Sequence, residues 1–363
     1  MRAFVDCRYV RVGRHDGISR YTAGLVAELA RLVPVELLVS DERQRAHLPD
    51  LPWHLISAPT SWREPFVARQ VRRLRPDVVF SPMQTMGSWG RDYGLVLTLH
   101  DLIYYRNPTP PRDLPAPVRA LWRAFHLAWW PQRLLLNRAD HVVTVSRTTQ
   151  DLIARHRLTR RPVTVVTNAA DPVPPGEATR RELPTGALVY MGSFMPYKNV
   201  ETLVRAAALL PGHELHLMSP LPAAARERLG ALAGAGGLVF HDGASDAEYR
   251  RVLRGATALL SASRDEGFGI PLVEAMALGT PVVVSDIPVF REVGGDAGTY
   301  VAADDPEGFA RAVRELDDPV EWDRRSAASR LQAARFDWGT SAGVLAELLT
   351  RVAGERRRSA SRA

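Results

Sequence analysis

Cysteine is nearly absent: the 363 residues include one, Cys7. A single cysteine excludes a disulfide-stapled scaffold and a cysteine-ligated zinc or iron–sulfur site. Long apolar runs are also missing, since none approaches the roughly 18 residues that a membrane-spanning helix needs. The opening MRAFVDCRYV is too short and too charged for a signal peptide. We therefore expect a cytoplasmic protein, with peripheral attachment to the inner face of a membrane as an accompanying hypothesis.

Lysine is the other scarce residue, because beside 46 arginines the chain has only Lys198. Arginine is a wide planar fork, whereas lysine is a compact point charge on a slim stem. A lysine kept in such an arginine-rich chain is typical of a cramped site that faces phosphate. Lys198 is therefore a candidate phosphate-binding residue.

The formal net charge of +7 is unevenly distributed: residues 1–170 are net positive and residues 171–363 are net negative. A basic half can serve nucleic acid, anionic lipid or phosphorylated substrates, and it is equally compatible with a solvated surface. Since no helix-turn-helix, zinc-finger or ribonucleoprotein motif is present, we expect no nucleic-acid partner.

Short apolar runs alternate with amphipathic stretches, which predicts repeated strand–helix units and a doubly wound α/β fold. The runs are continuously apolar, as in parallel strands that are covered on both faces. The expected strands are AFVDC, VELLVS, WHLIS, DVVFS, LVLTLH, HVVTVS and PVTVVTN, then ALVYMG, ELHLM, GLVFH, ATALLS and TPVVVS.

Two domains are expected, because residues 171–186 are rich in proline, glycine and charge, as a linker is. Residues 1–170 would form the N-terminal domain and residues 187–336 the C-terminal one. A helix over 337–354 would pack back toward the N-terminal domain, and 355–363 would be a disordered basic tail.

Several helices and caps are predicted from periodicity. Ser245 and Glu248 have the spacing of a capping box, and Asp305 followed by Pro306 is typical of a helix start. The expected helices include Ile18–Leu32, Val118–Asn137 as one long helix, Val200–Leu209, Ala223–Leu232 and Asp246–Arg254.

The strongest motif follows the expected strand ATALLS, where Glu266 precedes two closely spaced glycines and Pro271 opens a helix. Gly267 and Gly269 lack a Cβ, so their backbone can approach a ligand. The helix start concentrates unpaired N–H groups and positive potential, which favours an anion. Glu266 and Glu274 would repel phosphate, but they would suit hydroxyl groups that flank it, as in a nucleotide sugar.

The run EGFGIPLVE resembles the Glu–seven residues–Glu motif of the retaining GT-B glycosyltransferases of family 4, which include many mannosyltransferases. The resemblance extends over most of the chain, through LHDL, ADHVVTVS, VTNAAD, YMGSFMPYKNVETLVRAA and SDIPVFREVGGDAG. It implies a GT-B fold, in which two Rossmann-like, doubly wound parallel-sheet domains face a cleft. The N-terminal domain would bind the acceptor and the C-terminal domain the nucleotide sugar.

The resemblance also implies roles for individual residues. Glu266 would hold donor-sugar hydroxyls, Glu274 the ribose and Lys198 the diphosphate. Many relatives have arginine at the position of Ser193, which leaves Arg264 or Arg20 as the replacement cation. The implied catalytic residues are Glu266, Lys198 and His100, and the implied donor-binding residues are Gly17, Ser193, Lys198, Arg264, Glu266, Gly267, Phe268, Gly269, Ile270 and Glu274.

The expected reaction is retaining transfer of a hexosyl group, best matched by mannosyl from GDP-mannose, to a glycan or lipid-linked acceptor. No metal and no cofactor beyond the nucleotide-sugar donor are expected, because a lysine and a helix start can stabilise the departing diphosphate. A UDP-sugar donor is the alternative within the fold. A non-catalytic protein that binds nucleic acid or an anionic surface is the alternative of another class. A dinucleotide oxidoreductase is disfavoured, since GRHDGISRY lacks the G-x-G-x-x-G spacing.

Tryptophan is concentrated in the first half, which holds six of the eight. The expected long helix has an apolar stripe that includes Leu121, Trp122 and Phe125, with Arg119 and Arg123 off it. Such a helix can lie on an anionic membrane surface or pack on the sheet of its own domain. Both alternatives remain open at this stage.

Overall fold

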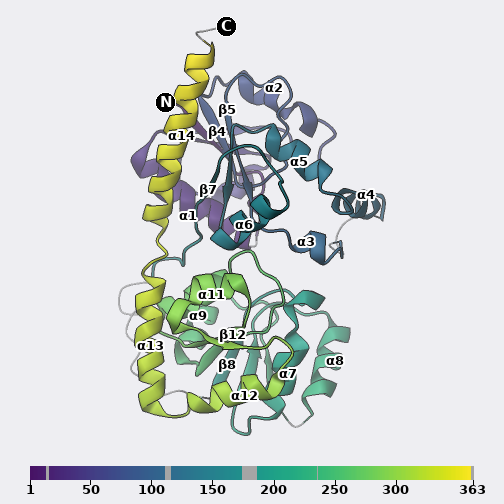
Figure 1. Cartoon of the computed structure of the whole chain (residues 1–363), viewed down its shortest axis with the longest axis vertical. Coiled ribbons are helices and arrows are strands. Elements are labelled where there is room, and N and C mark those ends of the chain that lie inside the picture. Colours follow the sequence, from purple (N-terminus) through teal and green to yellow (C-terminus); the bar gives the residue numbers. More distant parts are fainter. Residues whose placement is uncertain (14–15, 111–115, 174–185, 235, 361–363) are drawn as a thin grey trace. The chain divides into compact units, whose positions relative to one another are not determined.

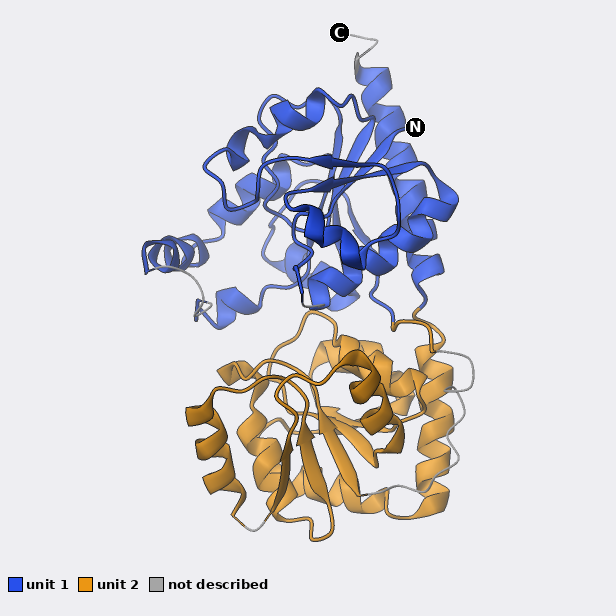
Figure 2. Cartoon of the chain, turned by 180° about the vertical axis from the view of Figure 1, so that it is seen from behind, with its two compact units in different colours: residues 1–169, 337–363 blue, residues 170–336 orange. Residues whose placement is uncertain are grey.

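A computed structural model describes residues 1–13, 16–110, 116–173, 186–234 and 236–360. The chain forms two compact units (Figure 2): unit 1 comprises Met1–Ala169 with Asp337–Ala363, and unit 2 comprises Ala170–Phe336. Both are α/β units with a parallel sheet, which confirms the expected doubly wound architecture. Most of the expected linker, residues 174–185, lies outside the described residues.

Unit 1 has a seven-stranded parallel sheet in the order β3-β2-β1-β4-β5-β6-β7. Strands β4, β5 and β7 of this sheet are labelled in Figure 1. Its central strands are buried along their whole length, as their continuous apolar runs predict. The strands are β1 (Ala3–Asp6), β2 (Val35–Val39), β3 (Trp53–Leu55), β4 (Val78–Ser81), β5 (Gly94–Leu99), β6 (His141–Thr144) and β7 (Val163–Val165).

The helices of unit 1 come from both ends of the chain, since α14 packs against α1. A Cβ on Gly24 of α1 would lie 2.4 Å from the Trp338 ring, so glycine is what permits this close approach. The helices are α1 (Gly17–Leu32), α2 (Val67–Arg72), α3 (Ile103–Arg106), α4 (Ala116–His126), α5 (Trp130–Asn137), α6 (Arg147–Arg155) and α14 (Trp338–Ala360), with 3₁₀ turns at Glu42–His47 and Glu64–Phe66.

The prediction of a disordered tail from residue 355 is wrong for the residues that the structure describes. Helix α14 continues to Ala360. Arg357, near the end of this helix, forms an ion pair with Asp77 at 2.7 Å. Asp77 directly precedes β4, so the pair holds the end of the helix beside the start of that strand. The basic residues at positions 356 to 358 therefore lie on the surface of a helix.

The prediction of one helix over Val118–Asn137 is also wrong, because α4 and α5 are separate helices. Pro131 lies in the first turn of α5, where it lacks an N–H and clashes with a continuing helix on its N-terminal side. Every residue of α4 is at least partly exposed, and Leu121 is 72% exposed. Its apolar stripe is therefore not covered by the sheet.

Unit 2 has a six-stranded parallel sheet in the order β10-β9-β8-β11-β12-β13. Its last strand was not predicted from the sequence. The strands are β8 (Ala187–Tyr190), β9 (Glu214–Leu217), β10 (Gly237–Phe240), β11 (Ala258–Ser261), β12 (Val282–Ser285) and β13 (Thr299–Val301).

The helix starts of unit 2 agree with the sequence in part. Asp305 caps α12 by accepting from the Gly308 N–H at 2.8 Å, as predicted. Ser245 likewise caps α9, but the predicted capping box is only half formed, because the Glu248 carboxylate contacts His241. The helices are α7 (Val200–Ala208), α8 (Ala223–Ala233), α9 (Asp246–Gly255), α10 (Ile270–Ala277), α11 (Pro288–Gly294), α12 (Pro306–Glu315) and α13 (Pro319–Ala333), with 3₁₀ turns at Pro196–Lys198 and Gly295–Ala297.

Each sheet has a point where the strand order reverses. The first and fourth strands of each unit are neighbours, namely β1 with β4 and β8 with β11. In doubly wound sheets the loops after these two strands separate and leave a crevice where ligands bind. We therefore expect ligands to bind at the carboxyl ends of these four strands.

Candidate functional site

Lys198 lies in the 3₁₀ turn Pro196–Lys198 that follows β8. Asn199 ends the turn in the left-handed conformation, with φ of 52°. Its side-chain amide donates to the carbonyl of Ala303 at 2.7 Å, which anchors the turn to the loop after β13. The Arg264 N–H donates to the carbonyl of Tyr197 at 2.8 Å and ties the same turn to the loop after β11. Lys198 is thus held by backbone that is fixed from two sides.

Glu266 lies in the loop after β11 and meets Lys198 at the reversal point of the sheet. The Lys198 ammonium donates to Glu266 Oε1, and the Ser263 hydroxyl donates to the same oxygen at 2.9 Å. Both charged side chains keep some exposure, 16% for Lys198 and 12% for Glu266. Within the described residues the ammonium donates to Glu266 alone, so two of its three N–H bonds remain for a ligand.

The start of α10 adjoins this pair. Gly269 precedes the helix with φ of 96°, and a Cβ there would lie 2.9 Å from the Phe290 ring, so the position requires glycine. No side chain caps the helix within the described residues. Pro271 has no N–H and the Leu272 N–H donates to the carbonyl of Gly269 at 3.0 Å, so what suits an anion here is the positive end of the helix dipole. Phe268 is buried and packs edge-on against Phe336, with ring centroids 5.4 Å apart, so its side chain anchors the loop.

The other predicted residues of unit 2 differ in what they offer a ligand. Glu274 is the fifth residue of α10 and Ile270 the first, and both are partly exposed. Ser193 is exposed, and its carbonyl accepts from the Tyr190 hydroxyl at 2.6 Å. The Arg264 guanidinium donates to Asp304 and, at 3.2 Å, to the carbonyl of Pro196. As a replacement cation Arg264 is thus already paired, and it acts here as a clamp.

Two predicted residues, Gly17 and His100, belong to unit 1. Gly17 is the first residue of α1, directly after the cap Asp16. His100 directly follows β5, and its Nε2 lies 2.7 Å from the carbonyl oxygen of Pro82. A carbonyl can only accept, so Nε2 carries the proton. Burial lowers the pKa of His100, which favours the neutral ring.

Sequence reasoning missed three residues that shape the site: Ser263, Asn199 and Asp304. Ser263 is three residues before Glu266, a spacing at which a hydroxyl can reach a carboxylate, so that signal was available. The contact of Asn199 with Asp304 spans 105 positions and that of Arg264 with Asp304 spans 40, so no local pattern reveals them.

Neither a metal-binding cluster nor a membrane-spanning helix is found in the residues that the structure describes. Across the ranges that the structure describes, no three His, Cys, Asp or Glu side chains gather where they could hold a metal ion. In the same ranges no helix is both long and apolar enough to cross a bilayer.

Comparisons with known families cover both units. Residues 15–173 match the family described as Glycosyltransferase Family 4, and residues 185–318 match the one described as Glycosyl transferases group 1. The O-antigen chain mannosyltransferase RfbU of Salmonella typhimurium is 24% identical over 330 residues, which are 85% of this chain and 89% of that protein. A D-inositol 3-phosphate glycosyltransferase of Thermobispora bispora is 30% identical over 289 residues, 72% of this chain and 65% of its own.

Solved structures of the same architecture also exist. HepE of Anabaena, in complex with UDP-glucose, matches with a TM-score of 0.72 over 97% of this chain and 100% of its own. Its sequence identity is 16%, so the likeness speaks for the fold alone.

Proposed function

Because the chain belongs to the group 1 glycosyltransferases of the family 4 type and has their GT-B fold, we propose that it transfers mannose from GDP-mannose to a glycan or lipid-linked acceptor. The observation that carries the proposal is the meeting of Lys198 and Glu266 beside the uncapped start of α10. A cation, a carboxylate and the positive end of a helix together suit a sugar diphosphate. The mannosyltransferase among the relatives supports the choice of sugar.

The chemistry follows from where charge develops. As the bond between the anomeric carbon and the diphosphate oxygen breaks, negative charge grows on the leaving group. Lys198 and the first turn of α10 stabilise that charge, so the reaction needs no metal. The acceptor oxygen forms the new bond to the anomeric carbon on the same face and gives its proton to the departing phosphate, which retains the configuration.

Glu266 acts by binding in this proposal and not as a covalent nucleophile. Its Oε1 already accepts from Lys198 and Ser263, which orients the carboxylate and lowers its reactivity. Its other oxygen has no protein partner within the described residues and can accept from a sugar hydroxyl. Glu274, one turn into α10, binds the ribose hydroxyls. His100, directly after β5 of unit 1, binds a hydroxyl of a sugar substrate.

The test is a thermal-shift series with GDP, UDP, dTDP and NAD on the wild type and on Lys198→Ala. A ligand at roughly 100 times its dissociation constant stabilises the folded state by about 2.7 kcal/mol. We expect GDP to raise Tm and the rise to shrink in Lys198→Ala. Arg228→Ala, which removes an exposed cation paired with Glu201 in the same unit, is the matched control.

The outcomes separate the alternatives. A rise in Tm with UDP and not with GDP would favour a UDP-sugar donor and reject GDP-mannose. A response to NAD alone, or to none of the nucleotides, would refute the donor site. Transfer of labelled mannose to a lipid extract then tests the acceptor class.

A second proposal concerns the membrane: we propose that α4 and α5 rest on an anionic surface at the inner face. The segment 116–137 contains no acidic residue. Several of its apolar side chains are open to solvent, with Leu121 72%, Leu127 81% and Trp130 66% exposed, and α4 also carries Arg119 and Arg123. Exposed apolar groups with arginines and no acid suit a negatively charged lipid surface.

Co-sedimentation with vesicles that contain phosphatidylglycerol, at low salt, tests this contact. We expect binding of the wild type and loss of binding in Leu121→Asp. Leu331→Asp is the control, because Leu331 is equally exposed at 76% but lies on α13 of unit 2. Failure of the wild type to sediment, or equal loss in both variants, would contradict the proposal.

A further inference from the structure

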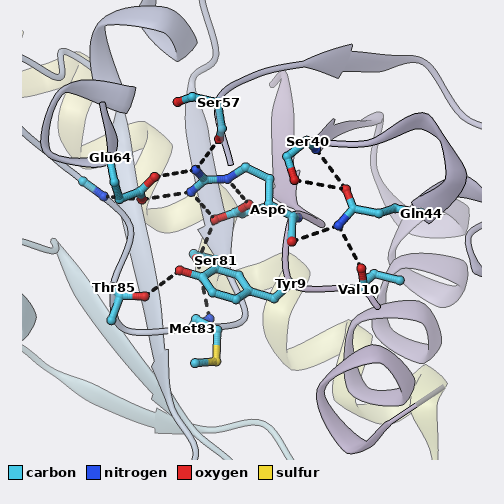
Figure 3. A network of polar contacts seen from close by, with 12 residues as sticks. Asp6, Tyr9, Val10, Ser40, Gln44, Ser57, Glu64, Ser81, Met83 and Thr85 are labelled. Carbon is cyan, nitrogen blue, oxygen red and sulfur yellow. Dashed lines mark hydrogen bonds and ion pairs between the residues drawn. The ribbon is translucent and has the colours of Figure 1, made fainter. Parts of the chain in front are cut away.

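A buried ionic cluster lies at the reversal point of the unit 1 sheet, where β1 and β4 end (Figure 3). The Arg8 side chain, which is fully buried, makes five hydrogen bonds. Two go to Asp6, two to Glu64 and one to the carbonyl of Ser57, with distances of 2.6–3.1 Å. Every N–H of the guanidinium is therefore used, and only arginine can bridge two carboxylates in this way.

The cluster holds the loop that follows β4. Asp6 accepts from the Ser81 hydroxyl at 3.1 Å, and the Met83 N–H donates to that hydroxyl at 3.3 Å. Glu64 accepts from the Gly87 N–H at 3.1 Å. Residues 81–87 are thus fixed at both ends through the two carboxylates that Arg8 joins.

The middle of the loop has its own contact. The Tyr9 hydroxyl lies 2.5 Å from Thr85 Oγ1 (Figure 3). Gln44 in turn holds the chain on either side of Tyr9, because its amide donates to the carbonyls of Arg8 and Val10 at 2.9 and 2.8 Å. The loop is therefore tied to the segment that carries Arg8 as well as to the carboxylates.

The same loop supplies the hydrogen-bond partner of His100. The carbonyl of Pro82, between Ser81 and Met83, accepts from His100 Nε2 at 2.7 Å. This bond keeps the proton on Nε2 and leaves Nδ1 of the neutral ring as an acceptor. The ring also packs edge-on against Tyr21, with centroids 5.0 Å apart. The position of one carbonyl thus decides which nitrogen of His100 can accept from a hydroxyl.

We infer that Asp6, Arg8 and Glu64 are positioning residues, which hold the Pro82 carbonyl and so fix His100 as a hydrogen-bond acceptor. Stability alone does not account for the cluster, because apolar packing would stabilise a buried site at least as well as an ion pair. A fixed acceptor suits a sugar hydroxyl and would repel a phosphate oxygen. The effect of the cluster on transfer rests on the function proposed above, whereas its effect on the ring does not.

The test uses ¹⁵N-labelled histidine in the full chain, with long-range ¹H–¹⁵N spectra that distinguish the two neutral tautomers. Among the ten histidines, the signals lost in His100→Ala identify His100. We expect the Nε2–H tautomer in the wild type and a mixture in Glu64→Gln and, to a lesser extent, in Tyr9→Phe. Both variants keep Arg8 buried, so they avoid the folding defect expected when Arg8 is removed.

Glu28→Gln is the matched control, since Glu28 also pairs with an arginine in unit 1 but on the surface of α1. In Glu64→Gln we expect kcat to fall roughly tenfold or more with little change in the KM of the donor. Unchanged His100 signals in both cluster variants would overturn the inference, whatever the activity. A shifted tautomer in a protein that transfers no sugar from any nucleotide donor would support the positioning role and reject the proposed function.

Discussion

The two sheets of this protein share one strand order around their reversal points but fill those points differently. In unit 1, Arg8 is fully buried and all its N–H groups are used by Asp6, Glu64 and Ser57. In unit 2, Lys198 is partly exposed and, within the described residues, donates to Glu266 alone. At the first reversal point all the guanidinium N–H groups are bonded within the protein. At the second, N–H bonds of the ammonium remain for a ligand.

The difference shows that topology offers a crevice and that side chains decide its use. Burial raises the pKa of Glu64, because the unit 1 cluster is shielded from water. Beside Glu266, no side chain within the described residues caps the start of α10, so the positive end of its dipole is not neutralised there. We infer that the side chains at the reversal point of unit 1 make that region rigid, whereas those of unit 2 bind a ligand.

Removal of Arg8 tests this comparison with the largest expected effect. Arg8→Ala leaves the carboxylates of Asp6 and Glu64 facing each other without a cation, and we expect the free energy of unfolding to fall by about 3–5 kcal/mol. Urea denaturation measures it. Arg31→Ala, which breaks an exposed pair with Glu28, is the control and should change it by less than about 1 kcal/mol. Equal losses of unfolding free energy in Arg8→Ala and Arg31→Ala would show that the buried cluster contributes no more than a surface ion pair.

Removal of Lys198 tests the other side. Lys198→Ala should reduce kcat/KM for the nucleotide sugar by about 10²–10³-fold, because the developing charge loses a donor. Its free energy of unfolding should change by less than about 1 kcal/mol, since the pair is partly exposed. Steady-state kinetics and urea denaturation on the same sample provide both numbers. A large loss of stability with little loss of rate would make Lys198 a structural residue like Arg8.

The glycine before α10 gives an intermediate effect. Gly269→Ala forces an alanine into a left-handed conformation, with its Cβ 2.9 Å from the Phe290 ring. We expect a loss of about 1–3 kcal/mol in the free energy of unfolding, together with weaker binding of the nucleoside diphosphate. In the control, Gly230→Ala, the new Cβ meets open space on α8, and this helical substitution should stabilise slightly. Unchanged diphosphate affinity in Gly269→Ala would separate this loop from the ligand.

The smallest effect concerns the clamp between Arg264 and Asp304. The hydrogen bond from Arg264 lowers the pKa of Asp304, so the pair stabilises the fold above the ordinary carboxylate pKa of about 3.9 and loses this contribution as pH falls through the lowered value. The pair is exposed, so Asp304→Asn should cost less than about 1 kcal/mol at neutral pH. The difference from wild type should vanish in acid. A difference that persists at low pH would exclude the ion pair as its cause.

Strands and the main site motif were readable from the sequence because each is local. Continuous apolar runs predicted twelve of the strands, and Pro271 predicted the start of α10. Lys198 was found by its rarity alone, and the structure places it against Glu266.

What the sequence could not show depends on contacts between distant segments. The pairing of Arg8 with Glu64 spans 56 positions, and that of Arg264 with Asp304 spans 40. The predicted long helix failed because periodicity continued through Pro131, whereas the backbone did not. Strand β13 has the sequence TYV, and the glycine before it and the alanines after it are poor strand formers, unlike the runs WHLIS and PVTVVTN around the equally short β3 and β7.

The return of α14 to unit 1 has a consequence for synthesis on the ribosome. Residues 170–336 can fold as soon as they emerge, because unit 2 is continuous in the sequence. Unit 1 is not continuous, because α1 at Gly24 packs against Trp338 and β5 at Gly94 packs against Val352. A Cβ on Gly94 would lie 2.7 Å from the Val352 side chain, so both contacts form only after α14 has been synthesised. The unit begun first is therefore completed last, and a ribosome that stalls near residue 336 would present a finished unit 2 beside an unfinished unit 1.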